Sequence, residues 1–330
     1  MNERYKPRLA LVLGSGGVRS IAALGMVEVL AREGILPDVI VGCSAGALFG
    51  ALIAMGHAAP KAVEIATGLW TAEVTRKHRW NAIPKMVWPR WGGFDADFSM
   101  RDDRLILSRL CDAFGETRLE DLELPLRVTA TDSQTGDSMV ICSGRMVDAL
   151  RASIAMPFLF APQLIEGRRV IDGFVSDPLP VNAASDAHAV IALGFEAPMP
   201  KRIDGPSRLL AQITSSMTNN LMQARLAAAK ANGMRLLHIA PVLERRVGLF
   251  DTGAMPYLVE QGRLATEARL PSIIALLEHR PHLLPPRRYP AVRAAPTGVQ
   301  KSGVSYGFVA DKRLQYRKTQ DQRTMVNCLE

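Results

Sequence analysis

Ser44 has the sequence setting of a catalytic nucleophile. It is the central residue of Gly42-Cys43-Ser44-Ala45-Gly46, a G-x-S-x-G pentapeptide between an apolar run and a helix-like stretch. In a sharp strand-to-helix turn the central residue takes a strained backbone conformation, and flanking glycines avoid the clashes that a Cβ atom would cause. The serine oxygen then lies near the helix N-terminus, where backbone N–H groups favour a developing anion. The pattern predicts an acyl nucleophile; a small-residue turn in an ordinary βα unit is the alternative.

Cys43 is a second nucleophile by chemistry. It precedes the apex of the predicted turn, so its side chain should point back into the packing, and we interpret it as a core residue. The four cysteines are far apart and have no C-x-x-C spacing, which disfavours a disulfide scaffold or a zinc site. Because His, Cys, Asp and Glu form no cluster with ligand spacing, we expect no metal and no cofactor.

A glycine-rich turn near the N-terminus could bind an anion. It follows the apolar run Leu9–Leu13, and consecutive backbone N–H groups without side-chain bulk can converge on a negative charge. A nucleotide phosphate is disfavoured, because the dinucleotide pattern needs Gly at Arg19 and the Gly-Lys-Ser/Thr of a P-loop is absent. The oxyanion of an acyl-transfer intermediate suits a loop beside the serine turn. The candidate oxyanion residues are Gly14, Ser15, Gly16, Gly17, Val18 and Arg19.

A serine nucleophile needs a group that accepts its proton. None of the six histidines lies in a catalytic-looking turn, which weakens a Ser-His-Asp hydrolase. Asp172 follows a short apolar strand and precedes Gly173 and Phe174, so this carboxylate could approach Ser44 directly. An aspartate with an ordinary pKa of about 3.9 is ionised at neutral pH but is a weak base. Positioning and the oxyanion loop would then supply most of the rate.

Alternating strands and helices must position these residues. Strand, turn, helix, strand, turn, helix is the βαβ pattern of a mostly parallel sheet, and the ends of neighbouring parallel strands bring both turns to one edge. The first two units predict strands over 9–13 and 38–41 and helices over 21–33 and 47–55. Further strands are predicted over 126–131, 138–142, 169–171, 189–193 and 236–239, and long helices over 207–231 and 256–277.

The sequence resembles the patatin-like phospholipase family across residues 8–278. Gly14–Ser20 is similar to its oxyanion loop, Gly42–Gly46 to its G-x-S-x-G, and Asp172-Gly173 to its D-G-[G/A] box; residues 130–136 and 151–157 resemble connecting segments of bacterial members. The resemblance implies a three-layer α/β/α fold with a mostly parallel central sheet. It also implies a Ser44–Asp172 dyad, an oxyanion hole of backbone N–H groups around Gly16 and Gly17, and calcium-independent hydrolysis of lipid esters.

Several positions depart from the family pattern. Ser15 and Ser20 replace glycines of the loop, Phe174 replaces the small third residue of the box, and Asp177 stands where Asn is common. Ser15 is tolerable if its φ is negative. Phe174 either narrows the acyl pocket or points away from it. Arg19 either supports the loop, meets a lipid phosphate or forms a surface salt bridge.

The charge lies mainly at the C-terminus. The 330 residues carry a net charge of +8, and nine Lys and Arg against three Asp and Glu follow Pro281, so the body is nearly neutral. We expect one acyl hydrolase domain over 8–278 and a basic, poorly ordered tail over 279–330. The dispersed charge is weak support for nucleic acid, so we expect no nucleic-acid partner, and an anionic membrane is the better candidate.

Trp70, Trp80, Trp88 and Trp91 all fall within one segment with interleaved basic residues. Amphipathic rings beside cations suit the headgroup zone of a bilayer, so Trp80, Trp88 and Trp91 are candidate lipid-facing residues of a lid or interfacial loop. Burial of these rings under a long loop is the alternative. The apolar run 9–13 is too short for a signal peptide, and residues 39–59 suit a strand and buried helix better than a membrane span. We expect a cytoplasmic location, with peripheral membrane contact.

Three functions are compatible with these motifs. The leading hypothesis is a lipid acyl hydrolase of phospholipase A or lysophospholipase type that acts through an acyl-Ser44 intermediate with Asp172 as base. A general carboxylesterase or thioesterase is the enzymatic alternative. A non-catalytic lipid-binding regulator is the third, and the intact Ser44, Asp172 and glycine loop argue against it.

Overall fold

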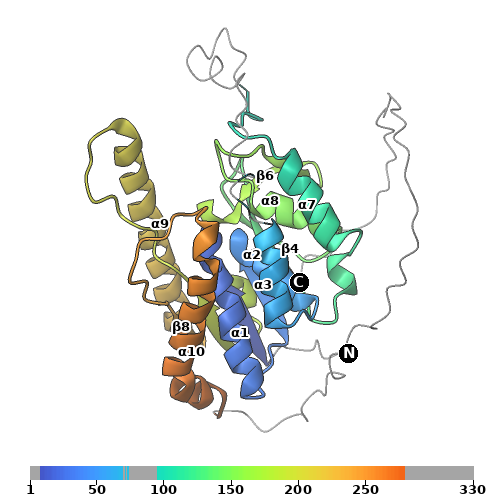
Figure 1. Cartoon of the computed structure of the whole chain (residues 1–330), viewed down its shortest axis with the longest axis vertical. Coiled ribbons are helices and arrows are strands. Elements are labelled where there is room, and N and C mark those ends of the chain that lie inside the picture. Colours follow the sequence, from blue (N-terminus) through green and yellow to red (C-terminus); the bar gives the residue numbers. More distant parts are fainter. Residues whose placement is uncertain (1–7, 70, 72, 74–94, 279–330) are drawn as a thin grey trace. The chain divides into compact units, whose positions relative to one another are not determined.

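An eight-stranded β-sheet forms the centre of the computed structural model, which describes residues 8–69, 71, 73 and 95–278 (Figure 1). The strand order is β5-β6-β3-β2-β1-β7-β8, and β4 also pairs with β3. The strands are β1 (Leu9–Leu13), β2 (Val39–Cys43), β3 (Leu126–Asp132), β4 (Ser138–Ile141), β5 (Gln163–Ile165), β6 (Arg168–Asp172), β7 (Ala189–Leu193) and β8 (Leu236–Ile239).

The sheet is mixed, with a parallel centre. The neighbours β3-β2-β1-β7-β8 all pair in parallel, whereas β4 and β6 pair antiparallel with β3, and β5 pairs antiparallel with β6. The central strands are buried on both faces and are almost wholly apolar, as is usual where helices cover both sides of a parallel sheet. The expectation of a mostly parallel central sheet is therefore confirmed.

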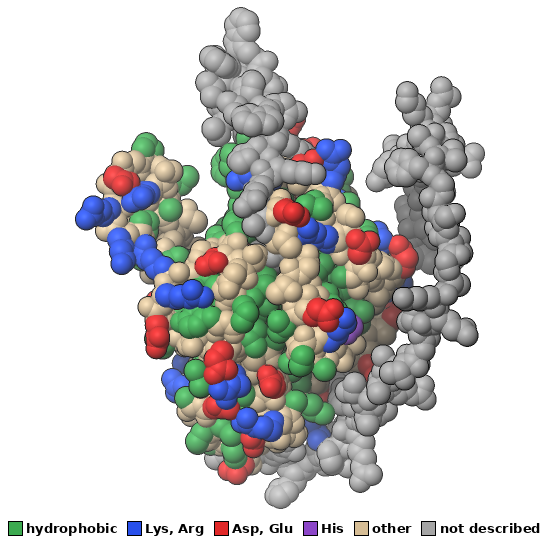
Figure 2. All heavy atoms as spheres, in the orientation of Figure 1, with side chains coloured by type: hydrophobic (Ala, Val, Ile, Leu, Met, Phe, Trp, Pro, Cys, Tyr) green, Lys and Arg blue, Asp and Glu red, His purple; other side chains and the backbone are tan. Residues whose placement is uncertain are grey.

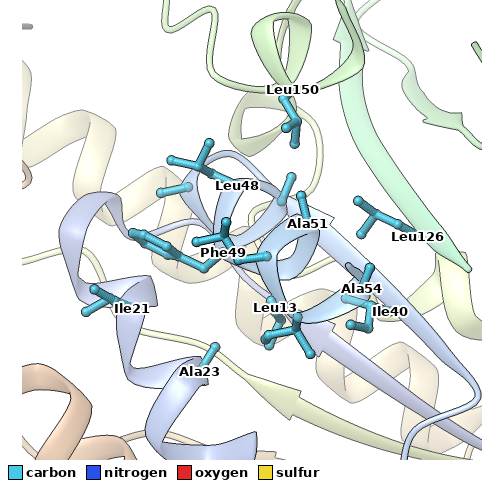
Figure 3. Packing of buried hydrophobic residues seen from close by; sticks show 14 of the residues in the cluster. Leu13, Ile21, Ala23, Ile40, Leu48, Phe49, Ala51, Ala54, Leu126 and Leu150 are labelled. Carbon is cyan, nitrogen blue, oxygen red and sulfur yellow. The ribbon is translucent and has the colours of Figure 1, made fainter. Parts of the chain in front are cut away.

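Helices cover the first face of the sheet. Leu9, Leu11 and Leu13 of β1 point into one hydrophobic core with α1 (Ala22–Arg32), α2 (Ala45–Ala54), α3 (Ala59–Leu69), α7 (Arg104–Phe114), α8 (Met146–Ser153) and α10 (Met255–Glu278). Phe49 of α2 is fully buried at the centre of this packing, between Ile21 and Leu48 (Figure 3). All ten residues of α2 are buried, which explains why its sequence lacks the polar stripe of a surface helix.

The second face carries a smaller core. Ala10 and Val12 point to this side because side chains alternate along a strand, and they pack with residues of the segment 179–184. The long helix α9 (Pro206–Ala231) contributes only Met222, Leu226 and Ala229 to this core. The fold thus has three layers, helix, sheet and helix, as expected.

The expected elements agree closely with the observed ones. β1, β7 and β8 have the predicted bounds; α9 begins one residue before the predicted start, and α10 extends one residue beyond the prediction at each end. The helix predicted over 21–33 is observed as α1, and a 3-10 turn, Gly17–Ile21, precedes it where the sequence predicted only a glycine-rich turn. Strand β5 and helices α3, α7 and α8 were not predicted. The predicted tail 279–330 and the tryptophan segment, with Trp70, Trp80, Trp88 and Trp91, lie outside the described residues.

Within the described residues, every helix is too short or too polar to cross a lipid bilayer.

Candidate active site

Ser44 occupies the tight turn between β2 and α2. Its φ of 55° and ψ of −129° place it in a backbone region that residues with a side chain rarely adopt. It is the residue before the first turn of α2, and it is 6% exposed. The predicted strained turn at the end of a buried strand is therefore present.

The glycines on both sides of Ser44 allow the chain to approach itself closely. A Cβ atom at Gly42 would lie 2.3 Å from the Cα atom of Ala47, and one at Gly46 would lie 2.3 Å from the carbonyl oxygen of Leu13. Real Cβ atoms do not approach backbone atoms this closely. Gly46 packs α2 directly against the end of β1, so it also joins the serine turn to the glycine loop.

Ser153, at the end of α8, holds the backbone of Ser44 in place. Its hydroxyl accepts the Ser44 N–H at 2.8 Å and donates to the carbonyl oxygen of Thr129 in β3 at 2.7 Å. All of these groups are buried, so the strained turn is tied to the neighbouring strand by two hydrogen bonds. Sequence reasoning missed Ser153, although it lies within the segment 151–157 that resembles a family motif.

Asp172, at the end of β6, meets Ser44 side chain to side chain. The Ser44 hydroxyl donates to Asp172 Oδ2 at 2.7 Å, and the backbone N–H of Phe174 donates to Oδ1 at 3.0 Å. The carboxylate is anchored because β6 pairs with β3, where Ala130 is its register partner. Gly173 is needed here, since a Cβ atom would lie 2.7 Å from the carbonyl oxygen of Thr129. The expected approach of the two side chains is thus observed.

Burial changes the acidity of Asp172. The side chain is fully buried, and this desolvation raises its pKa to about 7, against the opposing effect of the hydrogen bonds from the Phe174 N–H and the Ser44 hydroxyl. The expectation from sequence of an ordinary, weakly basic carboxylate is therefore wrong. A carboxylate with a pKa near neutrality is much better matched to accept a proton at pH 7.

The glycine-rich turn lies against the same edge of the sheet as Ser44. The N–H groups of Ser15 and Val18 donate to the carbonyl oxygens of Pro178 and Leu249, at 2.8 and 2.9 Å. In contrast, the N–H groups of Gly16 and Gly17 donate to no acceptor among the described residues. Gly17 has a φ of 60° and lines the same pocket as Ser44. Two unused donors beside a nucleophile are what an anion site requires.

Two side chains of this turn support the loop itself. The Ser20 hydroxyl donates to the carbonyl oxygen of Gly14 at 3.0 Å, which explains a serine at this position. Arg19 is 6% exposed; its Nε donates to the Gly16 carbonyl at 3.1 Å, a terminal nitrogen donates to the Glu196 carbonyl at 2.8 Å, and its guanidinium lies over the Phe195 ring. Burial lowers the pKa of Arg19 to about 10. Of the roles considered for Arg19, loop support is observed, and a surface salt bridge is wrong because the group is buried.

A small pocket connects these groups. The space between its walls, counted out to its open mouth, is about 280 Å³. Ser44, Asp172 and Gly17 form its polar side. Its apolar side consists of Ala45, Ile154, Met156, Phe160, Leu249 and Phe250. A polar reactive end with an apolar wall suits an ester whose acyl group is hydrocarbon.

Other candidate residues lie outside this pocket. Phe174 is half-buried and does not line it, so the interpretation that this ring narrows the acyl pocket is not supported. Cys43 is fully buried in β2, as expected for a core residue, and burial raises the pKa of its thiol. Ser15 does not have a positive φ and so is tolerated. None of the described histidines lines the pocket, and the described part of the chain has no group of three or more potential metal ligands.

Asp177 is a second buried carboxyl near this edge. Burial raises its pKa to about 6, while Arg225 of α9, whose Nε lies 4.0 Å from Oδ2, opposes that effect. Among the described residues, its Oδ1 has no hydrogen-bond partner. Asp177 does not line the pocket of Ser44, so we assign it no chemical role.

Comparison with known protein families shows to which family the chain belongs. The family model described as patatin-like phospholipase matches residues 11–185, which include the glycine loop, Ser44 and Asp172. The chain belongs to the patatin-like phospholipase family.

Curated relatives include both bacterial and mammalian proteins. An uncharacterized NTE family protein of Mycobacterium tuberculosis is 31% identical over 237 residues, which cover 70% of this chain and 60% of the relative. Patatin-like phospholipase domain-containing protein 7 of Rattus norvegicus is 29% identical over 192 residues, which cover 57% of this chain and 13% of that protein. The chain thus spans about 60% of the length of this mycobacterial relative.

Two solved structures are also similar. VipD from Legionella pneumophila matches with a TM-score of 0.42 and 13% identity, covering 83% of this chain and 67% of that one. Human GIVD cytosolic phospholipase A2, solved with a fluorophosphonate inhibitor, matches with a TM-score of 0.39 and 12% identity, covering 85% of this chain and 61% of that one.

Proposed function

We propose that this member of the patatin-like phospholipase family hydrolyses the carboxylic esters of lipids through an acyl-enzyme on Ser44, with Asp172 as the general base. The observation that carries the proposal is the 2.7 Å hydrogen bond from the Ser44 hydroxyl to Asp172 Oδ2, inside a pocket with an apolar wall. No third side chain needs to lie between nucleophile and base. The pKa of about 7 at Asp172 suits proton transfer at neutral pH.

In the first half of the reaction, Ser44 Oγ attacks the ester carbonyl carbon while Asp172 takes the hydroxyl proton. The carbonyl electrons move to the oxygen, and the N–H groups of Gly16 and Gly17 are the proposed donors to this oxyanion. When the tetrahedral intermediate collapses, the bond to the alcohol breaks and Asp172 returns the proton to the leaving oxygen. The acyl group stays on Ser44.

In the second half, water replaces the alcohol. Asp172 takes a proton from water, the resulting hydroxide attacks the acyl-Ser44 ester, and the same N–H groups hold the second oxyanion. Collapse breaks the bond to Ser44 Oγ, which recovers its proton from Asp172 as the fatty acid leaves. The apolar wall, including Met156, Leu249 and Phe250, is the proposed contact for the acyl chain.

The leading substrate class is a phospholipid or lysophospholipid, which the protein would reach by peripheral contact with an anionic membrane. A general carboxylesterase or thioesterase would use the same dyad on smaller esters, and the small volume of the pocket favours this alternative. The alternative outside the enzymes is a non-catalytic lipid-binding regulator. The hydrogen bond between Ser44 and Asp172 argues against it.

Active-site labelling tests the proposal directly. We expect a fluorophosphonate probe to label the wild-type chain at Ser44, not to label Ser44→Ala, and to label Asp172→Asn much more slowly because the hydroxyl loses its base. Labelling of Ser44→Ala at the wild-type rate would refute the mechanism. A panel of phospholipids, lysophospholipids, short esters and thioesters then separates the classes: turnover of short esters alone favours the esterase. Labelling without any turnover favours the regulator.

A further inference from the structure

The first half of α9 and the segment before it expose hydrophobic side chains that no other part of the described chain covers. In the described part of the chain thirteen large hydrophobic residues are exposed, and six of them lie between residues 199 and 217, a segment that we call the apolar projection. They are Met199, Ile203, Leu209, Leu210, Ile213 and Met217. A cluster of exposed apolar side chains on a protein surface usually marks a binding site.

The apolar side chains of α9 form one face of the helix. Leu210, Ile213 and Met217 are spaced by three and four residues, the spacing of a single helical face. At about 100° per residue, this face is opposite to Met222 and Leu226, which pack against the sheet in the second half of α9. The apolar face therefore points away from the body. Figure 2 shows this end of α9 as a projection with hydrophobic and basic side chains on its surface.

The polar side of α9 forms hydrogen bonds with the segment that follows β7. Asn219 bonds to both the N–H and the carbonyl oxygen of Ala197, at 2.7 and 3.1 Å, and the Ser215 hydroxyl donates to the Pro198 carbonyl at 3.1 Å. These bonds attach the segment after β7 to the helix. The polar groups are thus used internally, while the apolar groups face outward, the reverse of the usual arrangement for a surface helix.

Basic side chains accompany this apolar face. Lys201 and Arg202 lie between the exposed Met199 and Ile203, and among the described residues neither forms an ion pair. Asp204 is the acidic residue within the projection, and it is paired with Arg208 at 3.0 Å. Exposed apolar side chains with unpaired cations complement a surface that offers hydrocarbon below negative headgroups.

The projection lies at the edge of the sheet where Ser44 is found. β7 and β2 run in the same direction, so the chain leaves the end of β7 at the edge where β2 meets Ser44. Arg19 of the glycine loop contacts the Glu196 carbonyl in this departing segment, and Arg246 contacts the Met199 carbonyl at 2.6 Å. The loop that carries Arg246 also supplies Leu249 and Phe250 to the pocket. Val242, 81% exposed, lies in the same loop.

We propose that the apolar projection docks the protein on an anionic lipid surface, with the apolar face of α9 inserted among the acyl chains and Lys201 and Arg202 at the headgroups. Docking there brings the edge that carries Ser44 toward the membrane. This inference rests on the proposed function only where it assumes that the substrate of Ser44 comes from the membrane. Vesicle binding itself needs no hydrolysis.

The test uses the full chain with Ser44→Ala, which cannot turn over lipid, and vesicles of phosphatidylcholine with or without phosphatidylglycerol. We expect Leu210→Ser/Ile213→Ser/Met217→Ser to weaken partitioning into anionic vesicles by about tenfold or more. The control Leu36→Ser/Leu264→Ser/Ile274→Ser changes three other exposed apolar residues, 40–49% exposed, outside the projection and should bind as before. Every variant keeps residues 70–94 and 279–330, so these segments contribute equally.

A second pair of variants tests the charge. Lys201→Glu/Arg202→Glu should remove the preference for phosphatidylglycerol, whereas Lys230→Glu/Arg269→Glu, at exposed positions on the last turn of α9 and on α10, should retain it. Equal binding by the apolar variant and its control would overturn the proposal. So would a change from oligomer to monomer in the apolar variant with vesicle binding unchanged, since the face would then join copies of this chain.

Hydrolysis of a short soluble ester separates this proposal from the proposed function. With Ser44 intact, the projection variants should retain wild-type ester turnover, which also shows that they fold. If the wild-type chain hydrolyses no ester but still requires the projection to bind vesicles, the proposed function fails and the docking surface stands.

Discussion

The hydroxyl of Ser153 accepts the backbone N–H of Ser44 at 2.8 Å, so a residue that does not line the pocket holds the strained serine turn. The same hydroxyl donates to the Thr129 carbonyl at 2.7 Å, and the group is fully buried. A buried hydroxyl with both its donor and its acceptor satisfied is costly to remove, because its partners are left without hydrogen bonds.

We therefore predict that Ser153→Ala lowers the free energy of unfolding by roughly 1–3 kcal/mol. It should also lower kcat more than it changes KM, because the Ser44 backbone loses its restraint. Urea unfolding and ester kinetics measure the two effects. Ser133→Ala is the control: its exposed hydroxyl bonds to the Arg169 carbonyl, and its loss should cost less than about 0.5 kcal/mol. Equal stability of the two variants would show that the Ser153 bonds contribute nothing.

The raised pKa of Asp172 predicts a pH-dependent rate. Burial raises this pKa to about 7, and the base must be ionised to accept the Ser44 proton. We expect kcat/KM for a soluble ester to fall about tenfold per pH unit below 7 and to level off above it. Circular dichroism over the same range checks that the chain stays folded. A rate that stays level down to pH 5 would mean that the carboxyl has an ordinary pKa or is not the base.

The same pKa predicts a pH-dependent stability. Because the folded-state pKa of about 7 exceeds the ordinary value of 3.8, the folded chain binds the Asp172 proton more tightly than the unfolded chain does. Ionisation thus lowers the free energy of unfolding as pH rises from about 4 to 7, by up to about 4 kcal/mol. Asp172→Asn removes this cost, so its stability relative to wild type should rise over that interval and stay constant above it.

Urea unfolding at several pH values measures this difference. Asp112→Asn, at an exposed position on α7, is the control and should give a curve parallel to that of the wild type. A constant difference between Asp172→Asn and wild type from pH 4 to 8 would contradict the raised pKa.

Gly46 is predicted to be intolerant of a side chain. A Cβ atom there would lie 2.3 Å from the Leu13 carbonyl oxygen and 2.6 Å from that of Gly14, and backbone atoms cannot move aside cheaply. We expect Gly46→Ala to lower the free energy of unfolding by roughly 3 kcal/mol or more. Gly68→Ala, in α3 with no atom within 4 Å, should instead raise it by about 0.5–1 kcal/mol, because alanine favours a helix. Midpoints in urea compare the two, and similar midpoints would refute the close approach.

Local patterns in the sequence were sufficient for most strands, the serine and glycine-rich turns and the candidate dyad. Continuous apolar runs predicted β1, β7 and β8 with their observed bounds, because strands buried on both faces need apolar residues at every position. The G-x-S-x-G turn was predictable because its geometry imposes glycine on nearby positions. Arg19 had several open roles, since the sequence does not show that Phe195 and the Glu196 carbonyl lie beside it.

By itself, the sequence determined the family, the α/β fold class and the pair Ser44 and Asp172 as candidate nucleophile and base. The tertiary structure alone decided what lies between and around them. Ser44 and Asp172 are separated by 128 positions, and only the pairing of β6 with β3 brings their side chains to 2.7 Å. The pKa of about 7 follows from burial, which depends on the whole fold and is invisible in a local motif. For the same reason, only the packing of α9 shows which of its faces is covered and which is left outward.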